Sequence, residues 1–122
     1  MTLRILAIDD SRTMRDLLRA SLEEAGFYVT TAEDGTDGME RLQAAAPDVI
    51  ITDINMPRLD GFGVIEAVRE SEAAASVPIL VLSTESGAEM KDRARRSGAT
   101  GWIVKPFDDA RLISAIRRVA RV

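Results

Sequence analysis

The chain contains no cysteine and no histidine. The absence of cysteine excludes disulfides, thiolate metal sites and thiol nucleophiles. The absence of histidine excludes serine–histidine catalysis, histidine-ligated zinc and a phosphohistidine carried by this chain. Any bound metal ion must therefore be held by oxygen ligands, which favours a hard cation such as Mg²⁺.

Long apolar segments are also absent. No run approaches the roughly 20 residues of a membrane-spanning helix, and the N-terminus lacks the apolar segment of a signal peptide. We therefore expect a cytoplasmic protein that does not insert into a membrane. A length of 122 residues suits one compact domain, so residues 1–122 are expected to form a single domain with no output domain.

Charge is distributed unevenly along the chain. Residues 1–90 carry 7 basic and 17 acidic side chains, whereas residues 91–122 carry 9 basic and 3 acidic ones. A nucleic-acid-binding protein with a uniformly basic surface does not have this pattern, so no nucleic-acid partner is expected. The asymmetry predicts an acidic site built from the first part of the chain and a basic face built from the last.

Short apolar runs alternate with stretches of helical periodicity. The apolar runs predict strands over residues 3–8, 27–31, 48–52, 78–82 and 102–104. The periodic stretches predict helices over residues 38–46, 62–70, 85–97 and 108–121, and a first helix between a cap at Asp10 or Ser11 and a stop at Gly26. Its inward residues are expected to be Met14, Leu17, Leu18 and Leu22. This alternation predicts an α/β fold, a five-stranded parallel sheet with helices on both faces.

Reactive or charged side chains follow four of the five predicted strands. In chain order they are Asp9 with Asp10, Asp53, Ser83 and Lys105. Ligands of open parallel sheets bind beyond the carboxyl ends of the strands. The strand order 2-1-3-4-5 places Asp53 between the ends that carry Asp10 and Ser83, whereas the order 3-2-1-4-5 separates Asp53 from Asp10. We therefore predict the order 2-1-3-4-5.

Three carboxylates at one sheet edge repel one another unless a cation binds among them. Oxygen ligands favour Mg²⁺ for that cation. A central carboxylate beside a metal ion, a hydroxyl and an ammonium suits phosphoryl transfer, because the carboxylate attacks phosphorus while the cations neutralise the phosphoryl oxygens.

Four segments carry a family resemblance: residues 9–15, 53–61, 83–85 and 105–107. Together they resemble the receiver domains of bacterial response regulators, and most closely the single-domain chemotaxis regulators. The resemblance covers the whole chain and implies a flavodoxin-like fold. It also implies a cis peptide bond between Lys105 and Pro106.

The resemblance implies a role for each acidic position. Asp53 is the implied phosphoacceptor and a ligand of Mg²⁺. Asp10 is the implied direct carboxylate ligand of the ion, and Asp9 is implied to act through water. Asn55 is implied to supply its backbone carbonyl.

Other positions are implied to bind the phosphoryl group or to relay its arrival. Lys105 is the implied phosphate-binding lysine, and Ser83 with Trp102 forms the implied switch. Asn55 and Glu85 are implied to tune the lifetime of the acyl phosphate. Trp102 departs from the Tyr or Phe usual in the family. Thr84 departs from a smaller residue and is expected to narrow access to Asp53.

The resemblance implies a signalling switch that is not an enzyme, although it assists its own phosphorylation and dephosphorylation. Expected partners are a CheA-like histidine kinase as phosphodonor, a target such as a flagellar motor switch protein, and a phosphatase. A monomer is expected. The implied output face comprises the fourth helix, the fifth strand and the fifth helix, with Arg95, Arg96, Trp102, Arg117 and Arg121.

Three alternative functions stay open. The first is a phosphate sink or adaptor receiver in another pathway. The second is a Mg²⁺-dependent aspartyl phosphatase of the haloacid dehalogenase type. The third is a scaffold that no longer accepts phosphate. The phosphatase family carries a second aspartate two residues after its nucleophile, where this chain has Asn55. The complete set of Asp10, Asp53, Ser83 and Lys105 argues against the scaffold.

Overall fold

A computed structural model describes residues 2–120 of the chain. Five strands form one parallel sheet in the order β2-β1-β3-β4-β5, which confirms the predicted order. The strands are β1 Arg4–Ile8, β2 Tyr28–Ala32, β3 Val49–Thr52, β4 Ile79–Ser83 and β5 Gly101–Val104.

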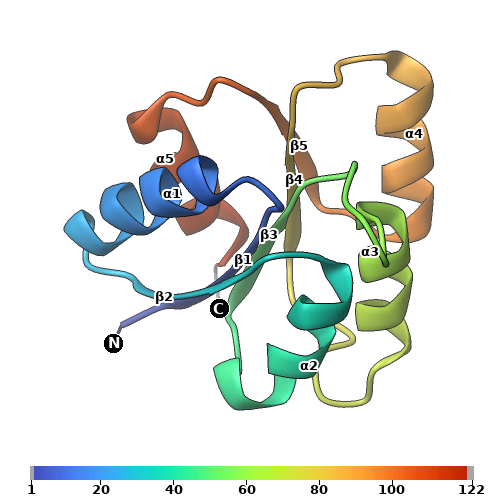
Figure 1. The fold of residues 1–122 in the computed structure, drawn as a ribbon, viewed down its shortest axis with the longest axis horizontal. Coiled ribbons are helices and arrows are strands. Elements are labelled where there is room, and N and C mark those ends of the chain that lie inside the picture. The colour runs from blue at the N-terminus through green and yellow to red at the C-terminus, as the bar shows by residue number, and fades with distance from the viewer. Residues whose placement is uncertain (1, 121–122) are drawn as a thin grey trace.

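The helices cover both faces of this sheet (Figure 1). They are α1 Arg12–Glu24, α2 Gly35–Ala45, α3 Gly61–Glu70, α4 Ala88–Ser97 and α5 Asp109–Val119. Helices α1 and α5 pack on one face, and α2, α3 and α4 pack on the other. Among the described residues no helix is long and apolar enough to cross a membrane.

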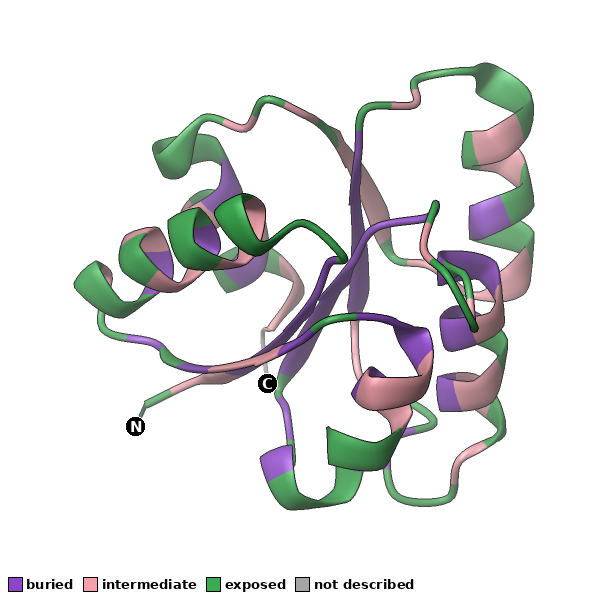
Figure 2. Cartoon of the chain, viewed as in Figure 1, coloured by how far each residue is buried: buried purple, intermediate pink, exposed green. Residues whose placement is uncertain are grey.

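Each strand sends alternate side chains into two apolar layers. In β1, Leu6 and Ile8 pack against α2 and α3, while Ile5 and Ala7 pack against α1 and α5. The central strands are therefore buried on both faces, as Figure 2 shows. This double burial explains why the strand sequences are continuously apolar rather than alternating.

The inward face of α1 differs from the prediction at one position. Leu18 and Leu22 are fully buried and Met14 packs beside them, but Leu17 is 52% exposed. Successive helical residues are separated by about 100°, so a face centred on Leu18 and Leu22 leaves Leu17 at its margin.

Two helices begin three residues away from their predicted starts, because side chains near those starts bind backbone N–H groups. Helix α2 begins at Gly35 rather than at Gly38, since the Asp34 carboxylate accepts a hydrogen bond from the Asp37 N–H at 2.8 Å. Helix α4 begins at Ala88 rather than at residue 85, since Ser83 Oγ accepts a hydrogen bond from the Glu85 N–H at 3.2 Å and holds the chain in a loop. Of the described α4 residues, Ala94 alone is buried, so the helix is loosely packed, as expected.

Candidate functional site

The carboxyl ends of β1, β3, β4 and β5 meet at one edge of the sheet. The parallel register pairs Ile8 with Thr52, and the Asp53 N–H donates to the Ile8 carbonyl at 3.0 Å. Between β4 and β5, the Lys105 N–H donates to the Ser83 carbonyl at 2.8 Å. These bonds extend the sheet by one residue and bring the polar strand ends together.

Three carboxylates converge there. Asp9, Asp10 and Asp53 each contribute one carboxylate oxygen, and these three oxygens lie within 4.8 Å of one another. Asp9 and Asp53 are buried, whereas Asp10 is exposed at the mouth of the site. An all-oxygen donor set with this charge fits a hard divalent cation such as Mg²⁺.

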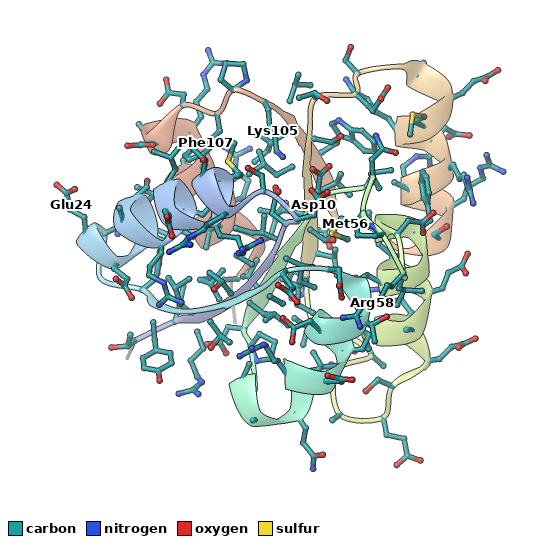
Figure 3. The ribbon with its side chains drawn as sticks, in the orientation of Figure 1. Asp10, Glu24, Met56, Arg58, Lys105 and Phe107 are labelled. Carbon is teal, nitrogen blue, oxygen red and sulfur yellow. The ribbon has the colours of Figure 1, made fainter. Side chains whose placement is uncertain are left out.

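Lys105 supplies the positive charge of the site. Its Nζ lies 2.7 Å from Asp9 Oδ2 and 2.8 Å from Asp53 Oδ2. Burial by itself would lower the pKa of Lys105, but hydrogen bonds and charges from Asp53 and Asp9 outweigh burial and raise it. Burial raises the pKa of Asp9 even though hydrogen bonds from Lys105 and the Ser11 N–H oppose that change. Figure 3 shows Lys105 and Asp10 at the same edge of the sheet. The Lys105–Pro106 peptide bond is cis, as the resemblance implied.

The Asp53 carboxylate is held at both oxygens. Oδ1 accepts a hydrogen bond from the Ile54 N–H at 2.6 Å, and Oδ2 accepts one from Lys105. The Thr52 hydroxyl donates to the Asp53 backbone carbonyl at 2.8 Å and fixes the chain at the end of β3. The side chain is thus oriented before any ligand arrives.

Three further predicted residues are joined in one chain of contacts. Asn55 Nδ2 donates to Glu85 Oε2 at 3.4 Å, across the loops that follow β3 and β4. The Trp102 Nε1–H donates to the Glu85 backbone carbonyl at 2.9 Å. Ser83 is fully buried at the end of β4, while Thr84 is exposed on the loop beyond it. The loop between β4 and α4 therefore connects Trp102 with the mouth of the site.

Comparison with known proteins places the chain in one family. The family model described as "Response regulator receiver domain" matches residues 5–117. This chain belongs to the response regulator receiver family.

Several proteins match this receiver domain over nearly its whole length. Protein PilG of Pseudomonas aeruginosa is 35% identical over 115 residues, which are 94% of this chain and 85% of PilG. The transcriptional regulator RpaA of Synechocystis is 36% identical over 118 residues, which are 97% of this chain and 49% of RpaA, so the receiver spans about half of that protein. A solved structure of the chemotaxis protein CheY4 of Vibrio cholerae is 41% identical, with a TM-score of 0.93 over 98% of this chain and 99% of CheY4.

The basic residues predicted for the output face of the receiver lie in different places. Arg95 and Arg96 are exposed on α4 and pair with Asp92, and a groove between α4 and β5 is lined by Arg95 and Trp102. Arg117 lies elsewhere, because its guanidinium is 5.6 Å from the centre of the Phe27 ring.

Arg117 also donates to the Ala25 carbonyl at 3.5 Å and therefore faces α1. Arg111 and Arg118 lie together on another flank of α5, where they line a shallow groove. The structure therefore places Arg117 on the flank of α5 that faces α1, and its part in target binding stays a prediction. Arg121 lies outside the described residues.

Two contacts of the receiver had no counterpart in the sequence prediction. Arg15 Nη1 donates to the Asp9 backbone carbonyl at 2.8 Å and steadies the loop after β1. Arg58 forms a two-point ion pair with Asp34. Arg15 belongs to the recognised motif, so its position in the sequence offered a signal, whereas a pair separated by 24 residues offered none.

Proposed function

We propose that Asp53 accepts a phosphoryl group from a histidine kinase, with Mg²⁺ bound beside it, and that phosphorylation switches the surface formed by α4, β5 and α5 to bind a target protein. The observation that carries this proposal is the Asp53 carboxylate itself. It is oriented by Lys105 and the Ile54 N–H and lies beside two more carboxylates. This arrangement suits an acceptor of phosphoryl groups.

In the proposed step, an Asp53 carboxylate oxygen attacks the phosphorus of a phosphohistidine on the kinase. The O–P bond forms as the P–N bond breaks, and the electron pair returns to the imidazole nitrogen, which then takes a proton from water. Lys105 Nζ begins 2.8 Å from Asp53 Oδ2, so its charge lies close to the phosphoryl oxygens during transfer.

Asp9, Asp10 and Asp53 would hold the metal ion, with the backbone carbonyl of Asn55 as a further oxygen ligand. When bound, Mg²⁺ supplies charge neutralisation at the phosphoryl oxygens. Lys105 supplies a further positive charge at the Asp53 carboxylate. The chain's own residues therefore set both the acceptor and its electrostatic surroundings.

The proposed switch acts through the loop between β4 and α4. The buried Ser83 hydroxyl donates a hydrogen bond to the new phosphoryl group and draws this loop toward the site. Trp102 moves with it, because its indole is bound to the Glu85 carbonyl. The result is a shift in the population of two arrangements of α4 and β5.

We further propose a role in chemotaxis or motility, with a CheA-like histidine kinase as donor and a flagellar motor switch protein as target. The likeness to the Vibrio cholerae chemotaxis protein CheY4 over nearly the whole of both chains supports this role. A pull-down with the phosphorylated chain, compared with Asp53→Ala, identifies the target directly.

The test of the acceptor is incubation with acetyl phosphate and Mg²⁺, followed by intact mass spectrometry. The wild type is expected to gain one phosphoryl group, and Asp53→Asn is expected to gain none. Full labelling of Asp53→Asn would refute the assignment. Steady hydrolysis of phosphate esters would favour the phosphatase alternative, and no labelling under any condition would favour the scaffold.

A further inference from the structure

The loop between β3 and α3, residues 53–60, contains a backbone conformation that is unusual for its residue type. Arg58 has a φ of 70°, in the left-handed region. This region is unfavourable for a residue with a Cβ atom, and it persists only where surrounding contacts impose it.

The contact is an ion pair with Asp34, the residue that caps α2. Arg58 Nε donates to Asp34 Oδ2 at 2.8 Å and Arg58 Nη2 donates to Asp34 Oδ1 at 3.0 Å, so the pair is bidentate. The Asp34 carboxylate is buried, and it also accepts the Asp37 N–H at the start of α2. The pair therefore joins the loop to the fixed end of a helix. Figure 3 labels Arg58 where the loop meets the start of α2.

The backbone beside this pair leaves little room for the loop to shift. A Cβ atom at Gly35, the first residue of α2, would overlap the Leu59 carbonyl, so loop and helix are in direct backbone contact. Within the loop, the Leu59 N–H donates to the Pro57 carbonyl and the Gly61 N–H to the Ile54 carbonyl, both at 2.9 Å. Arg58 thus anchors the loop to α2, while Asn55 contacts Glu85 across the site.

We propose that the Arg58–Asp34 pair is a positioning device for the metal site. Asn55, whose backbone carbonyl is the proposed further ligand, lies three residues before Arg58 in the same loop. Fixing Arg58 against α2 fixes the path of the chain from Asp53 to Leu59, and so presets the Asn55 carbonyl before the ion binds. This inference rests on the proposed function of the acidic cluster.

The test compares Mg²⁺ binding by isothermal titration calorimetry in the wild type, Asp34→Asn, Arg58→Gly and the double variant. Asn retains an oxygen that caps α2, and Gly is free of strain at a positive φ, so both variants are expected to fold. Each single variant is expected to weaken Mg²⁺ binding about tenfold. The double variant is expected to lose no more than the single ones, because both remove the same contact.

Arg41→Gln is the matched control. It removes the ion pair between Arg41 and Asp37 on the exposed side of α2, which does not touch the loop. Its Mg²⁺ affinity is expected to stay within about twofold of the wild type. Unfolding in urea with EDTA is expected to show Asp34→Asn and Arg58→Gly folded but less stable than the wild type, since both lose the ion pair. Titration of the folded variants then separates lost affinity from lost fold.

A second readout follows the loop without metal. Amide exchange of Leu59 and Gly61 in EDTA is expected to speed up in Asp34→Asn and Arg58→Gly and to stay unchanged in Arg41→Gln. Wild-type affinity in both pair variants, or a double variant that loses the product of the single losses, would overturn the positioning role. Failure of the wild type to bind Mg²⁺ would instead overturn the proposed function, and this role with it.

Discussion

Lys105 balances two buried carboxylates with one ammonium. It contacts Asp9 and Asp53 at 2.7 and 2.8 Å, while Asp10 adds a third negative charge nearby. The cluster keeps a net negative charge when Lys105 is charged. This excess would attract a divalent cation, because the lysine alone does not neutralise the three carboxylates.

Replacing Lys105 with Met is expected to lower the free energy of unfolding in EDTA by about 3 kcal/mol, because two buried carboxylates lose their partner. Added Mg²⁺ is expected to restore more stability to Lys105→Met than it adds to the wild type, because the ion supplies the missing charge. Urea unfolding with and without Mg²⁺ measures both effects. Lys91→Met, a change at the exposed lysine of α4, is the control, and an equal loss there would contradict the argument.

Asp34 makes a pH-dependent contribution to stability. The hydrogen bonds from Arg58 lower its pKa below the ordinary value of 3.8, with help from the Asp37 N–H. A depressed pKa in the folded state stabilises the protein above pH 3.8, and this contribution disappears as the pH falls through the folded-state value.

Asp34→Asn is therefore expected to be less stable than the wild type at neutral pH and equally stable in strong acid. The protonated carboxyl of the wild type is then uncharged, as the amide is at every pH. Urea unfolding of both proteins across the acid range measures the gap. A gap that persists below the folded-state pKa would show that the ion pair with Arg58 is not its cause.

Helix α4 is anchored at its C-terminus but not at its N-terminus. The Gly98 carbonyl at its C-terminus accepts two hydrogen bonds from Arg69, and Arg93 lies 3.9 Å from the centre of the Phe62 ring. At its start, the N-cap residue is Gly87, and no side chain among the described residues caps the helix there. Motion of the preceding loop is therefore expected to move the start of α4 while its end stays on α3.

The single tryptophan reports on that loop. Addition of Mg²⁺ and beryllofluoride is expected to change Trp102 fluorescence, because the indole must follow the Glu85 carbonyl or release it. Ser83→Ala keeps the fluorophore and Asp53 but lacks the hydroxyl, so its response is expected to be smaller. An unchanged spectrum after acetyl phosphate and Mg²⁺, in a wild-type protein shown by mass to be phosphorylated, would exclude Trp102 as part of the switch.

The sequence was sufficient to predict the sheet and the polar residues at its carboxyl edge. Polar residues stand where the apolar strands end, and one strand order unites them, so the meeting of Asp9, Asp53 and Lys105 followed from local pattern and topology. Helix starts were harder to predict, because Asp34 and Ser83 bind backbone groups that no periodicity reveals. These capping contacts depend on the path of the chain.

Features set by tertiary contacts were not predictable. The inward or outward direction of Leu17 depends on a rotation of α1, and that of Arg117 depends on where α5 meets α1. The pair of Arg58 with Asp34 joins two loops that only the finished fold brings together. Long-range contacts of polar side chains have no period in the sequence, which is why they appear only in three dimensions.

Across the whole molecule, the uneven distribution of charge along the chain becomes an uneven distribution of charge over the surface. Residues 1–90 carry a net charge of −10 and residues 91–122 carry +6. The acidic site lies at the carboxyl edge of the sheet, whereas α4 presents exposed Lys91 and Arg95 beside Trp102 of β5. A basic face of this kind attracts an acidic partner and speeds encounter, with a rate that falls as salt rises.

Charge reversal on this face is therefore expected to weaken the binding of the proposed target, a flagellar motor switch protein. The double variant Arg95→Glu/Arg118→Glu is compared with Arg117→Glu. The second variant reverses a charge on the flank of α5 that faces α1. Beryllofluoride with Mg²⁺ is expected to raise wild-type affinity by about 5- to 150-fold. Biolayer interferometry at rising ionic strength is expected to show a steep fall in the wild-type association rate and a shallow one in the double variant. An equal loss in Arg117→Glu, or an affinity that beryllofluoride leaves unchanged, would place the output surface elsewhere on the molecule.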